Sequence, residues 1–280
     1  METTVDIQLK KAQYFKELHQ RTGIFVIPNP WDTGSAKMLA ALGFQALATT
    51  SAGLAYSLGV PDGDGTLTRE ETLANVRAIV DASSLPVAAD LENGYGDDPD
   101  TCAETILLAA KAGAVGGSIE DATGNKENPI YPIELSVERI KAAVQAVRSL
   151  PFPFTLVARA ENLIHGRIDL DDTIRRLEAF ADAGADVLFA PGLKTKADIA
   201  AVVKAVAPKP VNVVTGLGAI SFTLDELAQL GVKRISLGSS LARVAYGSFF
   251  RAAQDIQQTR DFTFASGAMP YSEFNALFNV

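Results

Sequence analysis

Charged side chains follow three successive apolar runs of the chain. Asp90 and Glu92 lie at the end of one run, Glu120 ends the next, and Arg159 ends the third. Alternate residues of an extended chain point the same way, so Asp90 and Glu92 share one face while Leu91 takes the other. If the three runs are neighbouring parallel strands, their carboxyl ends meet at one edge and bring these charges together.

Carboxylates that converge in this way support three kinds of chemistry. They can form ion pairs at a rim, act as a metal-free acid/base pair, or hold a hard divalent cation. Two carboxylates held close together repel at a cost of several kcal/mol unless a cation or a proton intervenes. Because the set contains no histidine or thiolate, we favour Mg²⁺, with Mn²⁺ possible, and keep the other two interpretations as alternatives.

The guanidinium of Arg159 has two interpretations as well. It offers a planar fork of donors that suits a substrate carboxylate or phosphoryl group. Alternatively, it pairs with Glu120 or Glu161 as part of the scaffold. The two histidines, His19 and His165, are expected at the surface or at an interface.

Three loop segments are further candidates for ligand contact. The polar segment 122–132 is either a surface loop or a mobile lid that brings Lys126 and Asn128 over a bound ligand. The glycine-containing segments 215–218 and 238–240 follow the last two apolar runs, where many barrels bind phosphate through backbone N–H groups. Glycine there is equally consistent with tight turns.

Short apolar runs alternate with longer amphipathic segments along nearly the whole chain. The runs are continuous rather than alternating, which is typical of parallel strands covered on both faces. We predict eight strands, at 24–28, 46–50, 86–91, 116–120, 154–159, 186–190, 211–215 and 234–238.

The segments between the runs carry helix start and stop signals. The tetrapeptides 68–71 and 223–226 have the spacing of capping boxes, and Asp98-Pro99 places proline at a first helical position. Four segments repeat one theme, in which a glycine ends a helix and a strand begins at once: AALGFQAL, KAGAVGGS, DAGADVLF and QLGVKRIS.

Eight strands alternating with helices fit a single (β/α)8 barrel of the TIM type. The alternative, an open doubly wound sheet, lacks the expected G-x-G-x-x-G after its first strand. We expect an extra N-terminal helix at 1–22, the barrel at 23–258 with its last helix at 241–258, and a C-terminal helical tail at 259–280. The aromatic-rich tail covers either the barrel or a neighbouring subunit.

Composition excludes several classes of protein. The 280 residues include 25 Lys+Arg and 33 Asp+Glu, and a net charge of −8 argues against nucleic acid or an anionic membrane as a partner. One cysteine excludes an internal disulfide and a multi-thiolate zinc site. Because there is neither a signal-like start nor an apolar stretch long enough to cross a membrane, we expect a cytoplasmic protein.

Four motifs together resemble the isocitrate lyase/phosphoenolpyruvate mutase family. They are S-L-G-V-P-D at 57–62, D-L-E-N-G-Y-G at 90–96, I-E-D at 119–121 and V-A-R at 157–159, in the family's order. The resemblance covers about residues 22–260. It implies a (β/α)8 barrel, usually a homotetramer whose last helix is exchanged between subunits. It also implies action on α-keto acids or their hydroxy-acid adducts, in which C–C or P–C bonds are made or broken beside an enolate.

The resemblance also implies roles for individual residues. Asp90 would be the principal Mg²⁺ ligand, while Glu92 and Glu120 would help to hold the ion, mostly through water. Asp62 would line the site and Arg159 would hold the substrate carboxylate. The remaining implied contacts are backbone amides at Thr50, Ser51, Ala52 and Gly53, and the loop residues Lys126 and Asn128, which would contact the departing or attacking group.

Departures from the family pattern narrow the range of reactions that we expect. The lyase branch carries K-K-C-G-H in the loop where this chain reads G-N-K-E-N-P at 124–129, so the cysteine-dependent cleavage is not expected. The K-x-N pattern matches the mutase and phosphonopyruvate hydrolase branch, although Pro129 follows it. The mutase histidine position holds Ala190, and Glu92 replaces the more usual Asp.

We therefore predict a Mg²⁺-dependent enzyme that cleaves or rearranges a C–C or P–C bond of a small α-keto acid through an enolate. Oxaloacetate-like acids and phosphonopyruvate are the candidate substrates. The alternatives are a phosphoenolpyruvate or carboxyphosphonoenolpyruvate phosphonomutase, a non-catalytic α-keto acid-binding barrel, and a sugar-phosphate barrel that uses the loops after the last two strands.

Overall fold

The computed structural model describes residues 4–63, 65–216 and 222–278 and contains all eight predicted strands. The strands are β1 (Phe25–Ile27), β2 (Leu47–Ala48), β3 (Val87–Asp90), β4 (Gly116–Glu120), β5 (Thr155–Arg159), β6 (Val187–Phe189), β7 (Val211–Val214) and β8 (Arg234–Ser236). Every ladder is parallel, in the order β1-β8-β7-β6-β5-β4-β3-β2. The amide of Ala48 donates to the carbonyl of Pro28 (3.1 Å), which joins the two end strands and nearly closes the TIM-type barrel.

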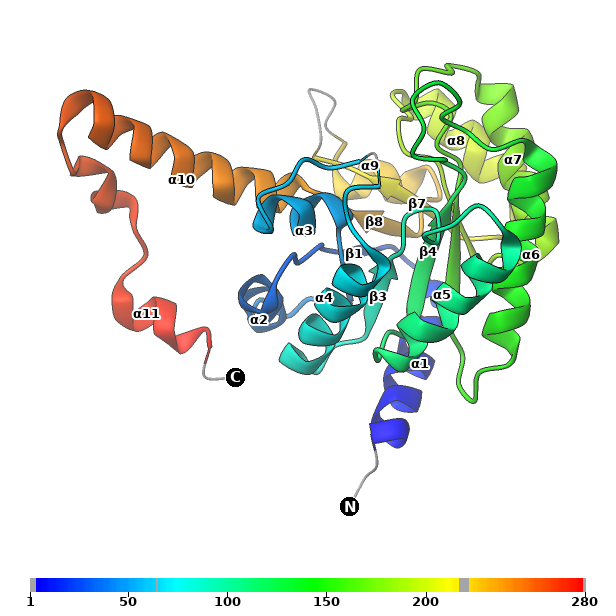
Figure 1. Cartoon of the computed structure of the whole chain (residues 1–280), viewed down its shortest axis with the longest axis horizontal. Coiled ribbons are helices and arrows are strands. Elements are labelled where there is room, and N and C mark those ends of the chain that lie inside the picture. Colours follow the sequence, from blue (N-terminus) through cyan, green and yellow to red (C-terminus); the bar gives the residue numbers. More distant parts are fainter. Residues whose placement is uncertain (1–3, 64, 217–221, 279–280) are drawn as a thin grey trace.

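Helices follow the strands around the outside of the barrel (Figure 1). They are α1 (Thr4–Gln20), α2 (Thr33–Ala41), α3 (Ser51–Ser57), α4 (Arg69–Ala82), α5 (Pro99–Lys111), α6 (Ile133–Arg148), α7 (Leu170–Ala183), α8 (Lys196–Ala205), α9 (Leu224–Gln229) and α10 (Ser240–Thr259), followed by the 3-10 helix η1 (Thr263–Gly267) and by α11 (Tyr271–Ala276). The short α3, which carries the candidate residues that follow β2, was not predicted from the sequence.

The predicted helix ends are confirmed. Thr68 and Thr223 form capping boxes with Glu71 and Glu226, and Asp98 caps α5 ahead of proline. The glycine that ends the helix in each of the four repeated segments has positive φ, as at Gly184 (φ 108°) after α7. A residue with a Cβ is strained in that conformation, so glycine lets each chain turn directly from helix to strand.

The N-terminal helix closes the floor of the barrel. Phe15 and Leu18 of α1 are fully buried against Phe25 and Ile27 of β1 and small residues of the neighbouring strands. His19, which was expected at the surface or at an interface, is half-buried in this structure. Its Nε2 is buried, and its ring lies edge-on to Phe15 (4.8 Å between centroids) and to Phe25 (5.0 Å), because α1 turns this face towards the strands.

The segment after β8 does not pack as the last helix of the barrel. Tyr246 still contacts Trp31 (6.1 Å between ring centroids), but beyond it α10 projects away from the barrel (Figure 1), and Ala242 is its one buried residue. Phe249 and Phe250 are exposed (71% and 66%). The tail then returns, and Lys37 of α2 donates to the carbonyl of Phe278 (3.4 Å). No helix in the described parts of the chain is long and apolar enough to span a bilayer.

Candidate active site

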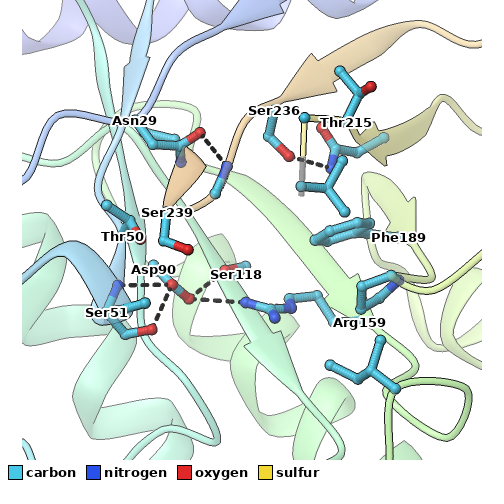
Figure 2. Close-up of a pocket in the computed structure, with 18 of the residues that line it drawn as sticks. Asn29, Thr50, Ser51, Asp90, Ser118, Arg159, Phe189, Thr215, Ser236 and Ser239 are labelled. Carbon is cyan, nitrogen blue, oxygen red and sulfur yellow. Dashed lines mark hydrogen bonds and ion pairs between the residues drawn. The ribbon is translucent and has the colours of Figure 1, made fainter. Parts of the chain in front are cut away.

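The carboxyl ends of the strands open into a cavity of about 640 Å³. A second cavity of about 300 Å³ lies beside it under the 122–132 loop and shares Ser51, Asp62, Arg159 and Ile164 with the first. We call them the main cavity and the loop cavity. Figure 2 shows polar side chains entering the main cavity from strands on opposite sides of the barrel.

Arg159 pairs with three carboxylates on the acidic side of this site. Its Nε donates to Glu161 (2.8 Å), Nη1 donates to Asp90 (3.0 Å), and Nη2 lies 3.2 Å from Glu120. Its guanidinium carbon lies 5.2 Å from the centre of the Phe189 ring. The pairing with Glu120 and Glu161 that the scaffold interpretation expects is present, and the same guanidinium also lines both cavities.

Asp90 is held from four directions at the end of β3 (Figure 2). One carboxylate oxygen accepts from the amide and the hydroxyl of Ser51 (3.1 and 3.0 Å). The other accepts from Arg159 and, at 3.4 Å, from Ser118. Its amide donates to the Thr49 hydroxyl (2.8 Å). The carboxylate orientation is fixed before any ligand binds.

Glu92 reaches the site by a left-handed backbone turn rather than by continuing the strand. β3 ends at Asp90, and Glu92 has φ 48°, with Tyr95 at φ 62° soon after. Such conformations are uncommon for residues with a Cβ and persist where the surroundings hold them. Leu91 is fully buried in the opposite direction, as predicted. Burial, together with the charges of Asp90 and Asp62, raises the pKa of Glu92 to about 7.

A buried arginine outside the site supports this strained loop. Arg139 of α6 donates from Nη1 to the carbonyls of Gly96 and Asp97 (2.6 Å each) and from Nη2 to the carbonyl of Asn93. The guanidinium carbon of Arg139 lies 4.5 Å from the centre of the Tyr131 ring, and the Tyr131 hydroxyl donates to the Asp97 carboxylate (2.6 Å). These bonds satisfy backbone groups that the left-handed turn leaves without strand partners.

The loop cavity carries an excess of carboxylates. Asp62, Glu92, Glu120 and Glu161 line it, with Arg159 and Lys126 as its cations. Burial raises the pKa of Asp62, of Glu120 and of Glu161, and the charge of Asp90 adds to the effect for Asp62 and Glu120. An environment that disfavours ionised carboxylates becomes favourable for them once a cation is bound.

This donor set fits a magnesium ion held largely through water. Among the described residues, no three His, Cys, Asp or Glu side chains are already gathered as a metal-binding group. Mg²⁺ keeps several water ligands and commonly takes one or two carboxylates. The site meets that requirement, because it offers oxygen donors, the fixed carboxylate of Asp90 and more negative than positive charge.

The 122–132 loop forms a closed turn. Ala122 and Ile130 form a β-bridge, and the Thr123 hydroxyl donates to the Asn128 carbonyl (2.6 Å). Lys126 lines the loop cavity. Asn128 is exposed and is not among the described residues that line either cavity, because its backbone is held in the turn; Asn125 lines the cavity instead.

The predicted backbone amides are partly used inside the chain. Ser51 donates its amide to Asp90, and Gly53 donates to the Thr50 hydroxyl (3.3 Å) as part of a helix cap. Thr50, Ser51 and Ala52 nevertheless line the main cavity. Gly53 is needed for packing, because a Cβ there would lie 2.8 Å from the Cβ of Trp31.

The glycine segment after β8 differs from the phosphate-binding prediction. The amides of Leu237 and Gly238 donate to the Asn29 side chain (2.8 and 3.0 Å), so they are already paired. Of the earlier segment, Leu217 and Gly218 lie outside the described residues. The sugar-phosphate alternative therefore loses its best donors after β8.

Sequence reasoning missed the polar residues on the far side of the main cavity. Asn212 of β7 and Arg234 and Ser236 of β8 are buried and line it, together with Phe189 of β6. The signal was present in the order Arg-Ile-Ser at 234–236, where alternation turns Ile235 outward to the helices and both polar neighbours inward.

The comparisons with known proteins agree with this geometry. The family described as phosphoenolpyruvate phosphomutase matches residues 15–257. A crystal structure from Burkholderia cenocepacia J2315, described only in general terms as a lyase/mutase, is 57% identical, covers 98% of each chain and has a TM-score of 0.95.

Two relatives have named activities. The 2-methylisocitrate lyase of Escherichia coli K12 is 36% identical over 194 residues, which are 66% of this chain and 64% of that protein. The structure of oxaloacetate acetylhydrolase in complex with oxalate is 26% identical, covers 97% of this chain and 95% of that one, and has a TM-score of 0.86. Fold, motif order and family match agree: this chain is an enzyme of the phosphoenolpyruvate mutase/isocitrate lyase superfamily.

Proposed function

We propose that this enzyme, with Mg²⁺ bound, cleaves or rearranges the bond β to the carboxylate of a small α-keto acid through an enolate. One observation carries the proposal: Asp90, Arg159 and Glu120 form a fixed, largely buried ionic group that opens into a cavity large enough for a small molecule. The names of the relatives, which include lyases and an oxaloacetate acetylhydrolase, support the class of substrate.

Arg159 and Ser51 orient the reactants. A guanidinium has five N–H donors, and three directions of Arg159 are taken by carboxylates, which leaves donors for a substrate carboxylate. Ser51 holds Asp90 with two bonds, so that carboxylate does not need to reorganise during the reaction.

Asp90 would hold the ion directly, with Glu92 and Glu120 acting through water. When bound, Mg²⁺ supplies stabilisation of the negative charge that develops on the enolate. The 122–132 loop covers the loop cavity and excludes water, and Lys126 contacts the departing or attacking group. Asn125, rather than Asn128, is placed to share that contact.

We also propose that the exposed apolar residues of α10 are covered by a neighbouring subunit, consistent with a homotetramer. Val244, Phe249 and Phe250 expose 64%, 71% and 66% of their surface on a helix that leaves its own barrel. Large exposed apolar surface of this kind marks interaction sites.

The test compares three substrates side by side. Pyruvate release is followed from oxaloacetate, phosphonopyruvate and 2-methylisocitrate with excess Mg²⁺, and each assay is repeated with EDTA. EDTA-sensitive release from one substrate, above its metal-catalysed background, supports the proposal and identifies the bond. In parallel, phosphorus NMR of phosphonopyruvate detects conversion to phosphoenolpyruvate, which would select the phosphonomutase alternative. Binding of a keto acid without any product would select the non-catalytic alternative.

A further inference from the structure

Cleavage of the bond proposed above needs a proton that none of the residues assigned so far supplies. When that bond breaks, its electron pair passes into the enolate, and the enolate becomes a keto acid only after a proton is added to its carbon. Arg159, Ser51 and Lys126 are assigned to orientation and to the departing or attacking group. A phosphonomutase rearrangement adds no proton to that carbon, so the requirement belongs to cleavage alone.

Few side chains on the two cavities are suited to supply this proton. In the described parts of the chain, neither cavity is lined by a cysteine or a tyrosine. Glu120 and Glu161 are paired with Arg159 (3.2 and 2.8 Å). A bound cation would keep Asp62 and Glu92 ionised, because it offsets the burial and the neighbouring negative charge that raise their pKa. The carboxylates of the site are therefore proton acceptors rather than donors when the ion is bound.

One imidazole lines this space among the described residues. His165 lines the loop cavity, and its neighbour Ile164 borders both cavities. An imidazole gives and takes a proton readily near neutral pH, whereas a lysine ammonium ordinarily holds its proton more tightly. Arg159 also borders both cavities, so a substrate held by its guanidinium lies next to the space that His165 faces.

The turn that carries His165 is fixed by the fold. The carbonyl of Glu161, just after β5, accepts from the amide of His165 (3.2 Å). Asn162 is fully buried and donates to the carbonyl of Asp169 (3.0 Å) and to the hydroxyl of Thr173 in α7 (2.8 Å). The backbone of the turn is therefore held in place, while the exposed side chain of His165 can exchange protons with water.

The charges that face His165 come from several elements. Burial raises the pKa of Glu161, and the charge of Arg159 and, less strongly, that of His165 lower it. The other charged side chains on the loop cavity are Asp62, Glu92, Glu120 and Lys126. A divalent cation would balance the four carboxylates together with Arg159 and Lys126, so the imidazole could gain and lose a proton without a large opposing field.

We propose that His165 is the proton donor of the cleavage reaction. The imidazolium gives its proton to the enolate carbon. The electron pair of the enolate double bond forms the new C–H bond, the keto group re-forms, and the neutral imidazole takes a proton from water. This inference rests on the proposed function, because it needs the enolate. In the opposite direction, the same imidazole removes a methyl proton from pyruvate.

Exchange of the pyruvate methyl protons with solvent isolates this step. Proton NMR follows pyruvate in D₂O with enzyme and excess Mg²⁺, so no bond to a leaving group is involved. The wild type should exchange the methyl protons faster than Mg²⁺ alone. His165→Ala should exchange them at least about 100-fold more slowly than the wild type. Added imidazole should restore part of the rate, because the position is exposed.

Two controls separate proton transfer from binding and folding. Calorimetric titration with oxalate, a planar dianion shaped like the pyruvate enolate, should give the same affinity for the wild type and His165→Ala in the presence of Mg²⁺. Arg167→Gln changes an exposed residue of the same turn that lines neither cavity, and it should leave the exchange rate unchanged. If His165→Ala loses oxalate affinity together with exchange, and imidazole restores neither, the role of His165 is structural and the inference is wrong.

The outcomes also distinguish the two proposals. Exchange that survives His165→Ala overturns this inference, and exchange that is lost in Lys126→Met alone would make Lys126 the donor instead. A wild type that releases pyruvate from one of the three substrates without exchanging pyruvate protons also overturns it and leaves the proposed function standing. A wild type that does neither overturns both.

Discussion

The two sides of the barrel mouth use similar side chains in opposite ways. On the β3–β5 side, Asp90, Glu120 and Arg159 satisfy one another at 3.0–3.2 Å, and Ser51 fixes the carboxylate further. On the β7–β8 side, Arg234 and Asn212 lie opposite each other and leave buried donors and an acceptor unpaired.

This contrast suggests a division of work. Groups that act on developing charge are effective when they are held in place before the reaction begins. Groups that recognise a substrate gain most when the ligand supplies a partner that the free protein lacks, because a wrong ligand then leaves them unpaired. The same mouth thus combines a preorganised side with one that a ligand completes.

The largest effect is expected at the preorganised side. Asp90→Asn keeps the shape of the side chain but removes the charge that pairs with Arg159 and would hold the ion, so kcat should fall about 10³-fold or more. Steady-state assays on whichever of the three candidate substrates gives EDTA-sensitive turnover measure this. The matched control is Asp172→Asn, a carboxylate that also pairs with an arginine but lies outside both cavities. Turnover and Mg²⁺ binding that survive Asp90→Asn would refute the assigned role.

A second prediction sharpens the contrast between partnered and unpartnered arginines. Arg176 pairs with Asp121 at 3.0 Å, and both side chains are almost fully buried. Arg176→Met leaves Asp121 without its cation, so the free energy of unfolding should fall by about 3–5 kcal/mol. Urea unfolding measures it, with Arg175→Met, an exposed neighbour, as the control. A loss no larger than that of Arg234→Met would erase the distinction between the two arginines.

Features that depend on residues close together in the chain could be predicted from the sequence. The strands, the capping boxes at Thr68 and Thr223 and the glycine turns depend on neighbouring residues, so local patterns indicate them. Asp90, Glu120 and Arg159 end strands, which places them at the mouth once the barrel is known.

Other features depend on partners that are distant in the sequence. The left-handed turn at Glu92 is held by Arg139, more than 40 residues away, and the burial of His19 depends on how α1 meets the barrel floor. The direction of α10 is not indicated by local sequence either, because the helix leaves the barrel and Ala242 is its one buried residue. Arg234 was overlooked because an arginine that begins a strand is normally taken as solvated.

A third prediction concerns the floor below Arg234. Burial first, and then the charges of Arg234 and Lys233, lower the pKa of His19 to about 3 from 6.5. Between these values the unfolded chain binds more protons than the folded one, so His19 destabilises the fold as the pH falls below 6.5. The loss should reach up to about 2 kcal/mol at pH 5.

Urea unfolding at pH 5 and pH 7.5 checks this. His19→Asn should show a smaller difference between the two pH values than the wild type, and His165→Asn, at an exposed position, should not. Arg234→Met should also reduce the difference, because it removes one of the charges that oppose protonation of His19. Identical pH dependence in all four proteins would show that His19 is already solvated.

The smallest effect is expected in the loop that covers the acidic side. Lys126 lines the loop cavity with Glu92 and Glu120, whereas Asn128 is exposed and its carbonyl is held by Thr123. Lys126→Met should therefore lower kcat/KM about tenfold, and Asn128→Ala should change it by no more than about threefold. Both variants keep the backbone bonds of the turn, so a difference between them reports the side chains. If Asn128→Ala has the larger effect, the loop must rearrange on binding and bring Asn128 inward, and the loop cavity described here is then the open form of the site.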